Sequence, residues 1–326
     1  MRTLMPRLTP VALILALLLA ACGGDDGDGA SSDSTTSSQP LLSAIPASYD
    51  LAVGAPARFS VGLVSTDKGP VGYGTVDLRF FFLGKGAANE DDTAEAGPTA
   101  VGRYLPLPGS PPPPEGADKP VFLETTERGV YSAEVAFDRD GFWGVAATAD
   151  LDKPETATAT FKVLPAHAVP VPGDAAILSE NLTVDSAGDD LAALDSRAGG
   201  GDPVPDPELH ETTVKAAIAA GRPVLLVIST PTFCVSIFCG PITDMIAELA
   251  AAHADRASFV HIEVWKDFEG KAINDAAKEW IAKGADVNEP WVFLIGPDGK
   301  ITHRWDNIAT RGEIEPELEK LPVIAG

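Results

Sequence analysis

Three cysteines carry most of the chemistry that this sequence could perform, and they are Cys22, Cys234 and Cys239. A cysteine sulfur can be acylated, can form a disulfide, or can attack another disulfide once it is deprotonated. Cys22 stands far from the other two, whereas only four residues separate Cys234 from Cys239. A pair at this spacing predicts a disulfide, either structural or active in exchange chemistry.

The segment before Cys22 has the pattern of an export signal. Arg2 and Arg7 precede the apolar run from Val11 to Leu19, which is much shorter than the roughly 20 residues that span a bilayer. The run ends in Leu-Ala-Ala-Cys, which resembles the lipobox of bacterial lipoproteins. That resemblance implies a signal peptide over residues 1–21, a lipid on Cys22, and anchoring at the extracytoplasmic face of the cell membrane. The alternative is an ordinary secretory signal that ends beside a cysteine.

Residues 22–40 are expected to form a flexible tether after the lipidated cysteine. They contain almost no large apolar side chain, so they cannot bury enough surface to offset the entropy of becoming ordered. A random coil of this length reaches roughly 20–25 Å. Because exported compartments usually permit disulfides, Cys234 and Cys239 remain as an isolated pair once lipid occupies Cys22.

The composition excludes several classes of function. Acidic residues outnumber basic ones 47 to 24, and the net charge of −23 opposes binding to nucleic acid. The sequence has no Gly-rich phosphate loop, no zinc-type cysteine array and no HExxH motif. We therefore expect no cofactor and no metal ligands, and no nucleic-acid partner.

Residues 41–165 are predicted to form an all-β sandwich. Apolar and polar residues alternate from Tyr131 to Phe137 and again from Thr156 to Val163, as in half-buried strands. The run GVYSAEVAFDRDGFWGVAATA resembles immunoglobulin-like modules of bacterial envelope proteins. Residues 87–118, which include the prolines from Pro111 to Pro114, are expected to form a long exposed loop.

The rest of the chain alternates helices and strands. Residues 166–206 read as a linker with a possible edge strand, and residues 207–326 as an α/β domain with the order α-β-α-β-α-β-β-α. A helix is predicted over 207–220, ending at Gly221, and the apolar run from Pro223 to Ile228 predicts a strand buried on both faces. A capping box at Thr310 to Glu313 predicts the start of the last helix.

Residues 207–326 resemble the thioredoxin fold. The strand GRPVLLVIST leads into PTFCVSIFCGPITDMIAELA, as the strand of that family leads into its Cys-Gly-Pro-Cys turn and helix, and Pro290 stands where the family places a cis-proline. The resemblance implies thiol–disulfide exchange on envelope proteins, with Cys234, Cys239 and Pro290 as the site residues. The chain departs from the family in its CxxxxC spacing and in Ile228, which occupies the position of a buried acid.

The two cysteines are expected to have different roles. Pro241 suits a first helical turn, which places Cys239 near the positive end of a helix dipole and favours its thiolate. Cys239 is therefore favoured as the attacking sulfur, and Cys234 as the residue that resolves the mixed disulfide. In the family, the backbone beside the cis-proline pairs with the substrate peptide, which is the role expected of Pro290.

Two other functions remain open from the sequence. The pair could form a structural disulfide in a non-catalytic binding lipoprotein. A copper-binding or copper-delivery protein of the same fold carries a histidine just before the penultimate strand, but Asn288, Glu289 and Pro290 occupy that position here. His261 and His303 are interpreted as structural residues.

Overall fold

The computed structural model describes residues 42–86, 94–124, 127–234, 236, 238–282 and 287–324. The predicted signal peptide, Cys22 and tether lie outside these residues, as do Val235 and Ile237 between the paired cysteines. Residues 40–326 cluster into one compact unit. Within the described part of the chain, no helix is both long enough and apolar enough to cross a membrane.

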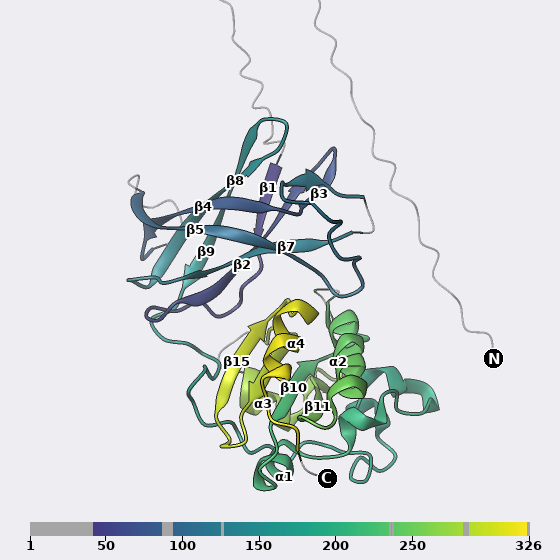
Figure 1. The fold of residues 1–326 in the computed structure, drawn as a ribbon. Coiled ribbons are helices and arrows are strands. Elements are labelled where there is room, and N and C mark those ends of the chain that lie inside the picture. Colours follow the sequence, from purple (N-terminus) through teal and green to yellow (C-terminus); the bar gives the residue numbers. More distant parts are fainter. Residues whose placement is uncertain are drawn as a thin grey trace, which may run out of the picture. The chain divides into compact units, whose positions relative to one another are not determined.

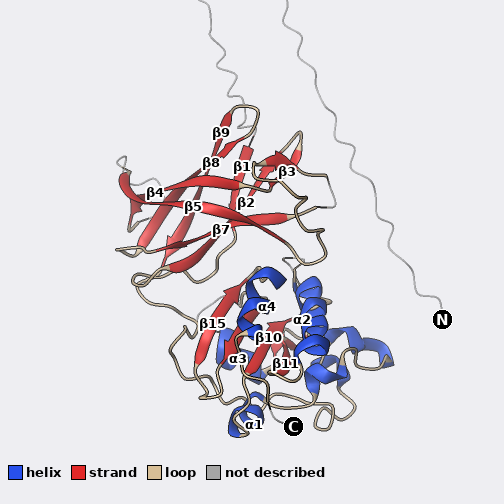
Figure 2. Cartoon of the chain, viewed as in Figure 1, coloured by secondary structure: helices blue, strands red, loops and turns tan. Residues whose placement is uncertain are grey.

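The first part of the chain forms a single large antiparallel sheet of nine strands (Figures 1 and 2). Eight strands follow the order β6-β3-β2-β7-β5-β4-β8-β9, and β1 pairs with β2. All nine strands belong to one hydrogen-bonded sheet. The sequence had predicted a sandwich, which is built from two sheets. The strands are β1 (Leu42–Pro46), β2 (Ala57–Ser65), β3 (Gly69–Gly72), β4 (Thr75–Gly84), β5 (Glu95–Pro106), β6 (Val121–Phe122), β7 (Gly129–Val135), β8 (Gly141–Asp150) and β9 (Pro154–Val163).

The alternation predicted from the sequence is confirmed in β9. Ala157 and Val163 are buried and Ala159 and Phe161 are half-buried, while the threonines and Lys162 between them are exposed. These apolar side chains join a core of aromatic residues in which Phe59, Phe80, Phe137 and Phe161 contact one another at ring-centroid distances of 4.9–6.0 Å.

The loop predicted over residues 87–118 is wrong for its central part. Strand β5 spans Glu95–Pro106 and pairs with β4 on one side and with β7 on the other. Its sequence, EAGPTAVGRYLP, has no regular alternation, and only Gly102 among its residues is fully buried. This strand therefore forms because the neighbouring strands supply hydrogen-bond partners for its backbone. Its own side-chain pattern does not predict a strand. The prolines from Pro111 to Pro114 are exposed and outside any strand, as predicted.

The second part of the chain contains a mixed four-stranded sheet in the order β11-β10-β14-β15. Strand β10 runs parallel to β11 and antiparallel to β14, and β14 forms a hairpin with β15. The strands are β10 (Val224–Ser229), β11 (Ser258–Glu263), β14 (Trp291–Ile295) and β15 (Ile301–Asp306), and a small hairpin joins β12 (Trp265–Asp267) to β13 (Ala272–Ile273). Every residue of β10 is buried, which confirms the prediction of a strand covered on both faces.

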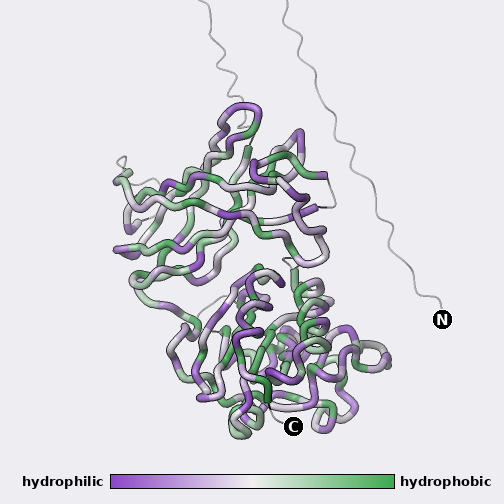
Figure 3. Tube along the Cα trace, in the orientation of Figure 1, coloured by the Kyte–Doolittle hydropathy of each residue, from purple (hydrophilic) through white to green (hydrophobic). Residues whose placement is uncertain are grey.

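Helices cover both faces of this sheet. Alternate residues of β10 divide between two cores: Val224, Leu226 and Ile228 pack with α1 and α3, whereas Leu225 and Val227 pack with α2 and α4. Figure 3 shows hydrophobic residues along β10 and α2. The helices are α1 (Val214–Ala219), α2 (Cys239–His253), α3 (Asp275–Ile281) and α4 (Arg311–Glu319). The element order predicted for residues 207–326 is confirmed except for the β12–β13 hairpin, which stands between β11 and α3 and was not predicted.

Two local predictions for this part are corrected. The helix predicted over 207–220 is divided into a 3-10 turn, η3 (Pro207–His210), and α1, because the Thr213 hydroxyl caps α1 by accepting a bond from Ala216 N–H. The capping box of α4 is not formed, since Thr310 Oγ1 donates to Glu313, whose carboxylate is bound by Arg58.

The predicted linker contains two further 3-10 turns, η1 (Leu191–Ala193) and η2 (Ser196–Gly201). It also contributes an isolated antiparallel bridge in which Ala175 pairs with Lys300 at the start of β15. The linker thus lies along the edge of the four-stranded sheet before it reaches α1.

Candidate functional site

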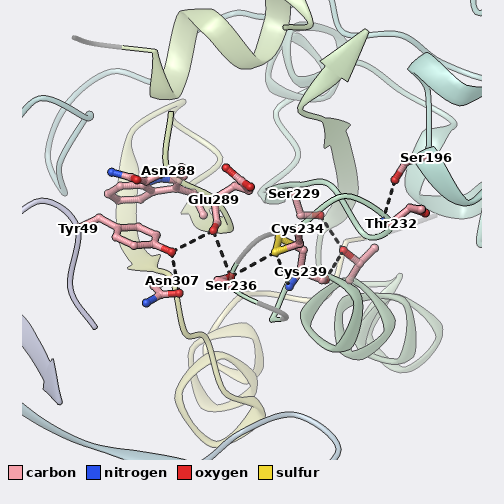
Figure 4. Close-up of a disulfide and its surroundings, with 12 residues drawn as sticks. Tyr49, Ser196, Ser229, Thr232, Cys234, Ser236, Cys239, Asn288, Glu289 and Asn307 are labelled. Atoms are coloured by element: carbon pink, nitrogen blue, oxygen red, sulfur yellow. Dashed lines mark hydrogen bonds between the residues drawn. A yellow bond between two sulfur atoms is a disulfide. The ribbon is translucent and has the colours of Figure 1, made fainter. Parts of the chain in front are cut away.

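Cys234 and Cys239 form a disulfide at the carboxyl end of β10 (Figure 4). Their Cα atoms are 5.9 Å apart. Cys234 lies in the loop that follows β10, and Cys239 is the first residue of α2. Strand β10 is buried on both faces and α2 packs against it, so the loop is held between two rigid elements.

The two sulfurs differ in exposure. Cys239 is fully buried, whereas Cys234 is half-buried and follows Phe233, which is 36% exposed. A thiol-containing client can therefore approach Cys234 but not Cys239. This burial argues against the sequence-based preference for Cys239 as the attacking sulfur.

The start of α2 stabilises negative charge on Cys234. The backbone N–H of Cys239 donates to Cys234 Sγ at 3.3 Å, and Ser236 Oγ lies 3.2 Å from the same sulfur. The first N–H groups of a helix have no partner within the helix, so they are available for an anion. The Cys239 N–H at this sulfur favours its thiolate and lowers the energy of its release as a leaving group. The helix dipole thus acts on Cys234, although Cys239 is the residue inside the helix.

The loop before β14 brings a carboxyl group to the disulfide. The Glu289–Pro290 peptide bond is cis, and a carboxylate oxygen of Glu289 lies within 4.8 Å of both sulfurs. Glu289 is only 9% exposed. Burial, together with the nearby Glu263 carboxylate, raises the pKa of Glu289 to about 7. At neutral pH this group can therefore both accept and give a proton beside the sulfurs.

Glu289 was not predicted as a site residue. The sequence drew attention to its position only because no histidine stands there. Ile228, at the position of the expected acid, is fully buried on β10. The acid near the sulfurs instead comes from the segment before Pro290, which is far from Cys234 in the sequence. Its position immediately before a proline that was itself a site candidate is the one signal that pointed to it.

Tyr49, from the segment after β1, fixes the backbone of this loop. Its hydroxyl lies 3.1 Å from the carbonyl oxygen of Glu289 and 2.8 Å from Asn307 Oδ1, and its backbone N–H donates to Asp306. Burial raises the pKa of Tyr49, so the phenol stays protonated and keeps its donor. Figure 4 shows Tyr49 beside the backbone of Glu289, which in turn lies near Ser236 and the disulfide.

An exposed aromatic pair borders the accessible sulfur. Phe233 stacks on Phe268 with ring centroids 4.1 Å apart and an interplanar angle of 1°. Phe268 is 42% exposed, and Trp265 packs edge-on against it. Exposed aromatic rings of this kind favour contact with apolar segments of another polypeptide.

The raised pKa of Glu289 predicts a pH-dependent stability that Glu289→Gln removes. The folded chain holds this proton more tightly than the unfolded chain, in which the pKa is near 4.5. The contribution of Glu289 to stability is therefore fully present below about pH 4.5 and is lost as the pH rises toward and through 7, by on the order of 2–3 kcal/mol at pH 7. Urea unfolding of both proteins at several pH values checks this, and a constant difference between them across that range would contradict it.

The histidines discussed in the sequence lie elsewhere. His303 is half-buried on β15, next to Thr302 and facing Glu317. His261 is buried on β11 and joins Ser229. In the reduced state, the groups at the start of α2 that could bind a metal ion are the two cysteine sulfurs and the Glu289 carboxylate.

Comparison with known proteins identifies no relative. No protein-family profile matches the chain, and no curated protein or solved structure is significantly similar to it.

Proposed function

We propose that the chain is a membrane-anchored, extracytoplasmic protein that exchanges disulfides with envelope proteins through Cys234 and Cys239. The proposal includes a thioredoxin-like layout for residues 207–326, an immunoglobulin-like layout for the large sheet, and a lipid on Cys22. The observation that carries it is the asymmetry of the disulfide. A half-buried sulfur accepts a hydrogen bond from the first N–H of a helix and lies beside the Ser236 hydroxyl, and its partner is fully buried.

The roles of the two cysteines are reversed from those favoured by the sequence. In the reducing direction, the Cys234 thiolate attacks a client disulfide, forms a mixed disulfide and releases one client sulfur as a thiolate. Cys239 then gives its proton to the Glu289 carboxylate, and its sulfur attacks Cys234. This step re-forms the Cys234–Cys239 bond and releases the second client thiolate. The client gains two electrons and the cysteine pair loses two, and the reverse sequence oxidises a client dithiol.

The surroundings of Cys234 suit an unfolded or extended client. Phe233, next to Cys234, and Phe268 offer an apolar surface, and the Glu289 carbonyl before Pro290 accepts from Ser236 in the same loop as Cys234. A structural disulfide needs neither an accessible sulfur nor a neighbouring acid with a pKa near 7.

An exchange assay with a peptide that carries a mixed disulfide to glutathione tests this function. Reduced wild-type protein is expected to release glutathione faster than an unstructured peptide thiol at equal concentration, because its thiolate is stabilised and its partner resolves the intermediate. The double variant Cys234→Ser/Cys239→Ser is the control and should be inactive. A wild-type rate no greater than that of the peptide thiol would show that the pair is structural.

Copper binding is a second candidate because of one observation, the clustering of Cys234, Cys239 and Glu289 within 4.8 Å. Thiolates are the preferred ligands of Cu(I). Competition between the reduced protein and a Cu(I) chelator tests it, and binding no tighter than micromolar would remove this candidate.

A further inference from the structure

A second cluster of polar side chains lies inside the α/β part of the chain, outside the cysteine site. Asp195 is the N-cap of η2, His210 ends η3, and His261 lies in the middle of β11. One oxygen or nitrogen atom from each residue lies within 4.8 Å of the others. All three side chains are at most 1% exposed, so water does not solvate them.

The hydrogen bonds around His261 determine which of its ring nitrogens carries the proton. Thr243 Oγ1 donates to the Cys239 carbonyl at 2.9 Å, so it must accept from Ser229 Oγ, which lies 2.7 Å away. The Ser229 proton is then committed, and Ser229 Oγ accepts from His261 Nε2 at 3.0 Å. A neutral His261 therefore presents the lone pair of Nδ1 to the Asp195 carboxylate.

The lone pair of His261 Nδ1 and the Asp195 carboxylate are both hydrogen-bond acceptors, so they cannot pair with each other. His261 Nδ1 and His210 Nε2 each lie 3.5 Å from Asp195 Oδ2, which is longer than a charge-assisted hydrogen bond of about 2.7–2.9 Å. No described residue forms a hydrogen bond with His261 Nδ1 or with either ring nitrogen of His210. Buried polar atoms are normally paired, so these three nitrogens call for a partner.

The spacing of these atoms suits a tetrahedral zinc ion. Zinc binds imidazole nitrogen at 2.0–2.1 Å and carboxylate oxygen at about 2.0–2.2 Å, so ligand atoms on one tetrahedral edge are about 3.3–3.4 Å apart. The two 3.5 Å separations match that edge. A histidine that binds a metal through one nitrogen usually donates its other N–H to a fixed acceptor, as His261 does to Ser229.

The charges near the cluster favour a cation. Arg197 binds Asp195 through Nη2 at 2.8 Å, but it also pairs with Asp206 at 3.0 Å and with Asp244 at 2.9 Å. Glu263, at the end of β11, accepts from Ser196 N–H next to Asp195. Three carboxyl groups thus surround one guanidinium, and the Glu263 carboxyl group lies beside the Asp195 backbone.

We propose that Asp195, His210 and His261 form a buried zinc site that fastens η2 and η3 to β11. Their burial leaves no position open to substrate, which a catalytic zinc needs. The site is separate from the exchange chemistry, although it supports the same region: Ser196 Oγ accepts from Thr232 N–H in the loop that leads to Cys234. This inference does not depend on the proposed function.

Zinc content measured by mass spectrometry on the oxidised, untagged full chain tests the proposal, because the disulfide keeps the thiols from binding metal. One zinc per chain is expected after loading with Zn²⁺ and gel filtration, and chelation should lower the wild-type melting temperature. His210→Ala and His261→Ala are each expected to lose on the order of 100-fold or more in zinc affinity. His303→Ala, at a half-buried position on β15 outside the cluster, should retain full affinity.

Three results would overturn the zinc site. They are wild-type protein that retains no zinc, a wild-type melting temperature unchanged by chelator, and full affinity in His210→Ala and His261→Ala. The first two use only the wild-type chain, so they decide the matter even where a variant does not fold.

Discussion

Cys239→Ser is expected to accumulate a stable mixed disulfide with client proteins through Cys234. The half-buried sulfur of Cys234 can still attack a client disulfide, but the residue that resolves the intermediate is gone. Cys234→Ser is expected to lose exchange almost completely, because the remaining sulfur is fully buried. Non-reducing electrophoresis followed by mass spectrometry measures the trapped species in both variants.

The assignment favoured by the sequence predicts the opposite pair of results, with trapping by Cys234→Ser. Alkylation of the reduced wild-type protein with limiting iodoacetamide gives an independent control, since Cys234 should be modified first. Trapped clients on the Cys234→Ser variant, or faster alkylation of Cys239, would show that the burial of these residues does not govern their reactivity.

The second large effect is expected at Arg304, where Arg304→Met should lower the free energy of unfolding by about 3–5 kcal/mol. Arg304 Nη1 binds Asp50 at 2.7 Å and the carbonyl of Val169 at 3.0 Å, and the two charged side chains are 12% and 3% exposed. Removal of the guanidinium leaves the Asp50 carboxylate buried without its main counter-charge. Urea unfolding at pH 7 measures the loss.

The loss of stability caused by Arg304→Met should depend on pH in a defined direction. Burial alone would raise the pKa of Asp50, but bonds from His167 and Ala168 N–H and the charge of Arg304 lower that pKa below its usual range. The stabilisation is therefore present above about pH 4 and is lost at lower pH, where Asp50 becomes protonated. Arg139→Met, at an exposed pair with Glu95, is the control and should change stability little. An equal effect of both substitutions would contradict the role given to burial.

Elements with strong local patterns could be predicted from the sequence. The continuous apolar run of β10 and the alternation in β9 identify buried and half-buried strands, and Gly221 identifies the end of α1. Strand β5 could not be predicted, because its pairing with β4 and β7 stabilises it more than its own side chains do. Local pattern reports burial, but it does not report which backbone groups a neighbour will satisfy.

The candidate site was predictable in its sulfurs and not in their roles. The spacing of Cys234 and Cys239 indicated the disulfide, but the exposure of each sulfur depends on the packing of α2 against β10. Glu289 approaches the disulfide from another loop, and its raised pKa comes from burial that only the folded chain creates. Asp195, His210 and His261 likewise come together only in the folded chain, because their spacing in the sequence matches no motif.

The reduction potential of the wild-type Cys234–Cys239 pair distinguishes a site of disulfide exchange from a structural disulfide. The oxidised protein is equilibrated with dithiothreitol and glutathione buffers, and the reduced fraction is counted by alkylation and mass spectrometry. An accessible pair that exchanges with clients should have a potential above about −300 mV, within the range of exchange proteins. A potential below that value would mean that the bond resists reduction by client thiols, and would show that it is structural.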